Sequence, residues 1–129
     1  LPKCSEGGLV MRSFLMATSL TVVIGAVHAA EFPPEATMPT AAEISAAFQG
    51  KSFNTPSPVG TIRSDYAKEG NGVTSFIRGQ SDQGTWKAED GRICFEMRNL
   101  RSTCNDVRFV GPDIYIGRSN GDVVKTEPR

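Results

Sequence analysis

The fold of this chain is decided by two stretches, Arg92-Ile93-Cys94-Phe95-Glu96-Met97-Arg98 and Cys104-Asn105-Asp106-Val107-Arg108-Phe109-Val110. In both stretches apolar and polar side chains alternate, which is the pattern of a half-buried β-strand. The connection between them, residues 99–103, is too short for the crossover that a parallel pair needs. The two stretches are therefore predicted to form an antiparallel hairpin.

Pairing Cys94 with Cys104 gives this hairpin a register in which residue 95 faces 103 and residue 93 faces 105. One face then carries the apolar side chains and the other face carries both cysteines. Opposed residues of a non-hydrogen-bonded pair have Cα atoms about 4.5 Å apart, which a disulfide tolerates. A structural disulfide is predicted. The alternative is a pair of reactive thiols, although the spacing is not that of a Cys-x-x-Cys motif.

Working outward from the hairpin, similar strand segments recur at intervals of about ten residues, joined by tight turns. Asn71-Gly72 and Asp90-Gly91 are typical hairpin turns. The further strand segments are residues 61–67, 73–79, 84–88, 114–116 and 123–125. Residues 52–60, which contain two prolines, are predicted to be a loop.

A short helix is predicted just before that loop. Thr40-Ala41-Ala42-Glu43 is a capping box, and Gly50 is a natural stop. A helix of about two turns must pack on other structure to persist. The predicted fold class is therefore α+β and mostly β: a short N-terminal helix packed on an antiparallel meander sheet of five to seven strands.

The N-terminal part of the chain is predicted to be an export signal. Residues 11–29 contain one arginine, a short apolar run and a small-residue cleavage pattern, and the run is shorter than the roughly 20 residues of a membrane span. Residues 1–10 are interpreted as an upstream artefact, residues 30–39 as a proline-rich linker, and residues 40–129 as a single domain. The expected localisation is periplasmic or secreted, with no membrane span after cleavage.

Composition restricts the chemistry that is open to the chain. Its 129 residues hold 14 Lys plus Arg and 14 Asp plus Glu, so the basic excess of a nucleic-acid-binding protein is absent. The single histidine, His28, falls in the predicted leader, which leaves no His-activated nucleophile for the exported domain. No metal site, no cofactor and no nucleic-acid partner are predicted.

Three arginines are candidate binding residues, because Arg92, Arg98 and Arg108 share the cysteine-bearing face of the hairpin. Guanidinium groups grip carboxylates and phosphates, so an acidic periplasmic protein or a small anionic ligand is the expected partner. The alternative is a solvated face whose charge is balanced by Glu96 and Asp106.

Aromatic residues offer a second pair of interpretations. They either line a ligand cup or form the core of a small domain, where aromatics supply the largest buried areas. The residues concerned are Trp86, Tyr66, Phe76, Phe95 and Phe109.

The stretch from Thr40 to Cys104 resembles a family of small exported proteobacterial proteins of unknown function. The resemblance rests on Thr40-Ala41-Ala42-Glu43-Ile44, Gly84-Thr85-Trp86, Asp90-Gly91-Arg92-Ile93-Cys94-Phe95 and the later Cys104. It implies the fold and the compartment, and it assigns no activity.

The expected function is that of an exported, non-catalytic binding or interaction module, which binds a small ligand or another secreted protein. The alternative is a small periplasmic enzyme that uses carboxylates without His or Cys. A concave pocket with buried, adjacent Asp or Glu would favour the enzyme, and an exposed apolar or arginine-rich patch on a curved sheet would favour the binding module.

Overall fold

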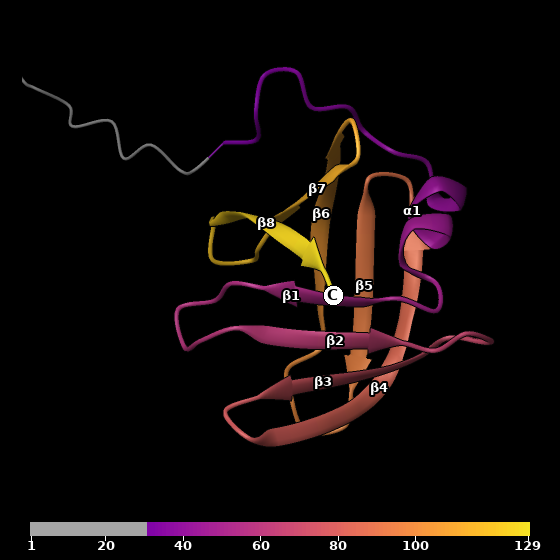
Figure 1. Cartoon of the computed structure of the whole chain (residues 1–129), viewed down its shortest axis with the longest axis vertical. Coiled ribbons are helices and arrows are strands. Elements are labelled where there is room, and N and C mark those ends of the chain that lie inside the picture. Colours follow the sequence, from indigo (N-terminus) through magenta and orange to yellow (C-terminus); the bar gives the residue numbers. More distant parts are fainter. Residues whose placement is uncertain (1–30) are drawn as a thin grey trace, which may run out of the picture.

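The computed structural model describes residues 31–129, which form a closed antiparallel barrel of eight strands preceded by one helix (Figure 1). The predicted upstream artefact (residues 1–10) and export signal (residues 11–29) lie outside the described residues. The elements are α1 (Ala41–Phe48), β1 (Ser52–Thr55), β2 (Ile62–Tyr66), β3 (Gly72–Ile77), β4 (Gln80–Glu89), β5 (Arg92–Met97), β6 (Thr103–Val110), β7 (Asp113–Gly117) and β8 (Val123–Pro128).

The prediction of a meander sheet of five to seven strands is wrong, because the sheet closes on itself. β1 forms in the stretch that was predicted to be a loop, and it pairs with β2 on one side and β8 on the other. Its pairing to β8 joins Phe53 to Pro128 and Asn54 to Glu127. Closure leaves no unpaired edge strand, so every strand has two neighbours.

The turn between β3 and β4 also lies elsewhere than predicted. β4 begins at Gln80, and the two-residue turn consists of Arg78 (φ 50°) and Gly79 (φ 75°). Two positive φ angles in succession belong to the hairpin turn whose twist matches that of the flanking strands. The polar residues 80–83, which separate the predicted strand segments 73–79 and 84–88, belong to β4 and form no turn.

The helix lies at one end of the barrel and closes it (Figure 1). The prediction that it packs on a face of the sheet is wrong. The capping box is confirmed, since Thr40 and Glu43 exchange hydrogen bonds. Asp90 in the β4–β5 turn accepts a hydrogen bond from the Ala41 amide at 2.8 Å. At the other end of the helix, the Gln49 amide group donates to two carbonyls of the β2–β3 loop.

The proline-rich segment before the helix packs along the outside of the barrel. Thr37 forms a two-way backbone bridge with Phe109 in β6, and the Pro39 carbonyl accepts from the Gly91 amide at 2.7 Å. The Arg108 guanidinium lies over the Phe32 ring, 5.2 Å from its centroid. Residues 31–39 therefore contact the domain along much of their length.

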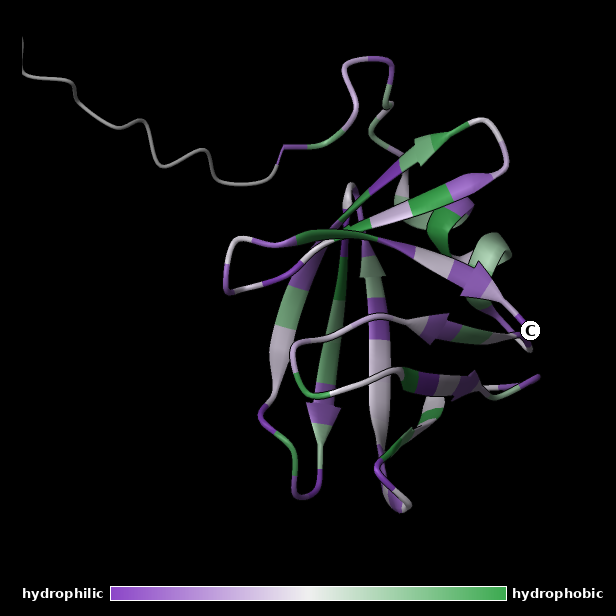
Figure 2. Ribbon diagram, turned by 60° about the vertical axis from the view of Figure 1, so that its left-hand side comes forward, coloured by the Kyte–Doolittle hydropathy of each residue, from purple (hydrophilic) through white to green (hydrophobic). Residues whose placement is uncertain are grey.

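More buried and less buried residues alternate along strands such as β3 and β7, and the ribbon in Figure 2 shows hydrophobic and hydrophilic bands along the strands. The predicted register of the central hairpin is confirmed, with Cys94 opposite Cys104, Phe95 opposite Thr103 and Ile93 opposite Asn105. The buried apolar core is Ile44, Phe48, Phe53, Tyr66, Val73, Trp86, Ile93, Val107, Ile114 and Ile116. This core fills the helix end of the barrel and leaves space toward the other end.

Candidate functional site

The candidate site is the interior of the barrel, where a cavity of about 300 Å³ remains. At about 30 Å³ per molecule this space equals roughly ten waters, the low end of the range for small-ligand pockets. The loops β1–β2, β3–β4, β5–β6 and β7–β8 surround its open end, which we call the mouth. The helix closes the opposite end.

Aromatic and aliphatic side chains form the floor of the cavity, which comprises Phe48, Tyr66, Ile93 and Phe95. The Tyr66 ring lies 5.2 Å from the Phe48 ring and 5.2 Å from the Trp86 ring, centroid to centroid. Burial raises the pKa of the Tyr66 phenol above its ordinary value of 10.0, against a smaller opposing effect of the Ser64 hydroxyl. The phenol is therefore neutral at physiological pH.

One wall of the cavity carries hydroxyl groups, which come from β1, β2, β3 and β8. Ser64 and Ser75 face each other across the β2–β3 pair. The Thr55 and Thr126 hydroxyls share a hydrogen bond of 2.7 Å, and both line the cavity. We call these four residues the hydroxyl wall. On the other side of the lumen, β5 and β7 contribute Phe95, Met97 and Ile116, and β6 between them contributes the polar Thr103 and Asn105.

Two arginines line the mouth. Arg101 belongs to the β5–β6 loop and Arg118 to the β7–β8 loop. Arg118 donates from Nη1 to the Pro56 carbonyl at 3.1 Å, which ties its guanidinium to the β1–β2 loop. Leu100, with 43% of its surface exposed, adds an apolar rim beside Arg101.

Asp82 holds the β5–β6 loop in place from inside the barrel wall. Its carboxylate is buried and accepts hydrogen bonds from the Leu100 amide at 2.7 Å and from the Asn99 amide at 3.0 Å. The Asn99 side chain and the Gln83 amide donate two more. These bonds, led by that of Leu100, hold the pKa of Asp82 below its ordinary 3.8.

The Asp82→Asn variant is expected to release the β5–β6 loop, because an amide nitrogen cannot accept the bonds that one carboxylate oxygen accepts. Amide hydrogen exchange at Asn99 and Leu100 should accelerate in the variant. In the wild type the depressed pKa makes the carboxylate's contribution complete above its unfolded pKa, and this contribution is lost as pH falls through the folded one. Glu96→Gln, on the exposed outer face, is the control. Unchanged protection of Leu100 in Asp82→Asn would contradict this role.

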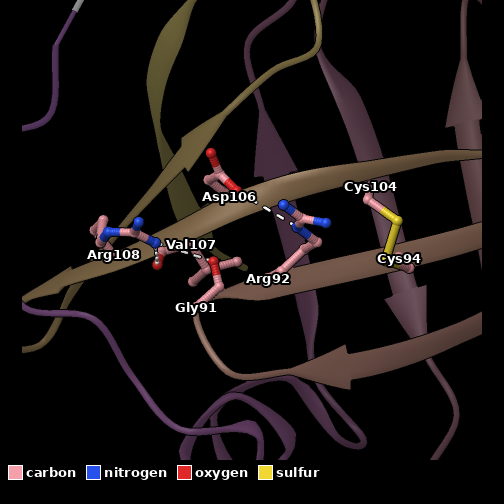
Figure 3. A network of polar contacts seen from close by, with 7 residues as sticks. All are labelled: Gly91, Arg92, Cys94, Cys104, Asp106, Val107 and Arg108. Carbon is pink, nitrogen blue, oxygen red and sulfur yellow. Dashed lines mark hydrogen bonds and ion pairs between the residues drawn. A yellow bond between two sulfur atoms is a disulfide. The ribbon is translucent and has the colours of Figure 1, made fainter.

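The three arginines predicted to bind lie outside the lumen. Arg92 and Arg108 flank the hairpin on its outer face, which also carries Cys94 and Cys104 (Figure 3). Arg92 forms a 3.6 Å ion pair with Asp106, and Arg108 donates to the carbonyls of Gly91 and Val107. Arg98 is exposed in the bend that follows β5. Asp106 on this outer face is thus one of the two acidic residues that the alternative interpretation, a solvated face with balanced charge, expected beside the arginines.

Four of the five candidate aromatics divide between the two interpretations, and Phe76 fits neither. Tyr66 and Phe95 line the cavity, while Trp86 is buried in the core with no hydrogen-bond partner for its Nε1 among residues 31–129. Phe109 packs against the core, and Phe76 points outward beneath the Arg63 guanidinium, 4.9 Å from its ring centroid.

Sequence reasoning missed the hydroxyl wall and both mouth arginines. The signal for Ser64 was present, since it has the parity of Ile62 and Tyr66, which were placed on one face. No comparable signal exists for Arg101 and Arg118, because they lie in loops outside any periodic segment.

Residues 31–129 contain no group of three His, Cys, Asp or Glu side chains placed to hold a metal ion. The one helix in this part of the chain is too short to cross a membrane. Comparisons with protein-family models, with curated proteins and with solved structures give no match to this chain.

Proposed function

We propose that this chain is a binding module that holds one small molecule in the lumen of its barrel. The observation that carries this proposal is the cavity itself, which has an aromatic floor, one hydroxyl wall and an open mouth. Eight-stranded barrels are just wide enough to hold one small ligand when side chains do not fill them. The lining groups suit retention by packing and by hydrogen bonds.

We also propose that the protein acts after export, in the periplasm or outside the cell. Cys94 and Cys104 lie at disulfide-bonding distance on the outer face of the hairpin. Such a pair is compatible with an oxidising compartment, where a small domain gains most from a covalent staple.

The proposal is tested with phenylacetamide, a neutral single-ring probe whose ten non-hydrogen atoms are on the order of the cavity's capacity of roughly ten waters. In backbone NMR titrations of the full chain, saturable shifts are expected at lumen positions such as Ser64, Ser75 and Ile116. Absence of saturable shifts at these positions would contradict lumen binding.

Two matched variants locate the probe. Ser75→Phe places a ring in the lumen and should abolish the shifts, whereas Thr74→Phe adds the same ring to the neighbouring outward position. Ser64→Phe provides a second blocking variant from the adjacent strand. Binding of phenylacetamide that survives in both blocking variants would place the probe elsewhere.

A further inference from the structure

The charged side chains that line the cavity are both positive. Arg101 and Arg118 are its lining cations, and Asp and Glu are missing from the part of the lining that residues 31–129 supply. The ion pairs of this part of the chain involve other cations, namely Arg63, Lys87, Arg92 and Lys125. Within residues 31–129, neither mouth guanidinium forms an ion pair with a carboxylate.

The loop segments that carry the two arginines are held by hydrogen bonds, and of the two side chains it is Arg118 that makes one within residues 31–129. The Arg118 side chain donates one hydrogen bond, from Nη1 to the Pro56 carbonyl, and its backbone amide donates to the Asp122 carbonyl at 2.7 Å. Arg101 directly follows Leu100, whose amide is fixed by Asp82. A guanidinium has five N–H donors in a planar fork that matches a carboxylate, so most donors of Arg118 remain for a ligand.

The lumen thus has an apolar floor at the helix end and two cationic groups at its mouth, where Leu100 also lies. The neutral phenol of Tyr66 and the Phe48 ring lie at the helix end, and the Phe95 ring lies 6.4 Å from that of Tyr66. The hydroxyl wall extends from there toward the mouth. A molecule with an apolar body and one anionic end matches this order in a single orientation. The cavity of about 300 Å³ limits that body to one ring or a short branched chain.

On this basis we propose that the barrel binds a small organic monocarboxylate, with its apolar body against the floor and its carboxylate at Arg101 and Arg118. This inference rests on the proposed function and specifies the chemical class of its ligand. The hydroxyl wall would hydrogen-bond a hydroxyl or carbonyl substituent on the body.

The test compares phenylacetate with phenylacetamide, which have the same shape and differ in charge. With the full chain in low-salt buffer, phenylacetate is expected to bind about tenfold more tightly, the size of effect that one charge-assisted contact supplies. This preference should shrink as salt is added. Arg101→Gln/Arg118→Gln should remove the preference and leave the affinity for phenylacetamide within about twofold.

The matched control is Lys87→Gln/Lys125→Gln, which removes two positive charges from outward positions of β4 and β8. It should keep the preference for phenylacetate, and each single arginine variant should lose part of it. Equal affinity of the wild type for both probes, or a preference that survives the double arginine variant, would overturn the carboxylate assignment while lumen binding stands. Failure of both probes to shift lumen residues would overturn the proposed function as well.

Discussion

Replacing Phe48 with alanine is expected to lower the free energy of unfolding by about 3–5 kcal/mol, the usual cost of removing a buried phenylalanine. Only 2% of its surface is exposed, and its ring packs against Phe53 and Tyr66 with centroids 4.8 and 5.2 Å away. An eight-residue helix has little stability of its own, so α1 depends on this anchor and on Ile44. Urea unfolding followed by Trp86 fluorescence measures the loss.

The control is a phenylalanine on the outside of the same barrel. Phe76 is 36% exposed and contacts the Arg63 guanidinium, so Phe76→Ala should cost about 1 kcal/mol or less. Equal losses for the two variants would mean that α1 does not depend on Phe48. Because small domains are stable by only about 5–15 kcal/mol, the Phe48 variant should also show a clearly lower thermal midpoint.

The central hairpin could be predicted from the sequence because two independent constraints agree there. The alternation of apolar residues fixes which side chains face inward, and the parity of Cys94 and Cys104 fixes how the strands are offset. A shift of one residue would have exposed the apolar set and separated the cysteines. The helix start could be predicted for a similar reason, since the capping box is a local interaction of Thr40 and Glu43.

Barrel closure could not be predicted, because it depends on a pairing between the two most distant strands. β1 is four residues long, and Phe53 is its one buried side chain, so the stretch resembles a polar loop. β8 continues past the predicted end to Pro128, and this extension supplies both residues that pair with β1. Nothing in either segment encodes its partner, because the pairing arises only when the intervening strands curl.

The lumen could not be predicted from the sequence for a different reason. Inward positions that carry serine or threonine resemble solvent-facing positions, since buried hydroxyls normally need partners. In this barrel Thr126 bonds to Thr55 and to the Asn54 carbonyl, while Ser64 and Ser75 face the cavity. Inward-facing hydroxyls thus indicate a partly empty interior. They can be recognised in the sequence only once it is known which positions of each strand face inward.

Loss of the Cys94–Cys104 link is expected to lower the free energy of unfolding by about 3 kcal/mol or slightly less, the chain-entropy value for a loop this short. The two residues are ten apart in sequence and directly opposed on β5 and β6, with Cα atoms 4.0 Å apart. Both side chains point outward, so Cys94→Ala/Cys104→Ala removes no core contact. The folded hairpin should keep its register, which the apolar face specifies independently.

The measurement is the urea midpoint of the wild type with and without a reductant, beside that of the double alanine variant. Reduced wild type and variant should lose the same amount, because in this account only the covalent link matters. Thiol titration of the denatured full chain should find one thiol before reduction, from Cys4, and three afterwards. Three thiols before reduction, or a midpoint that the reductant leaves unchanged, would show that the link does not stabilise this domain.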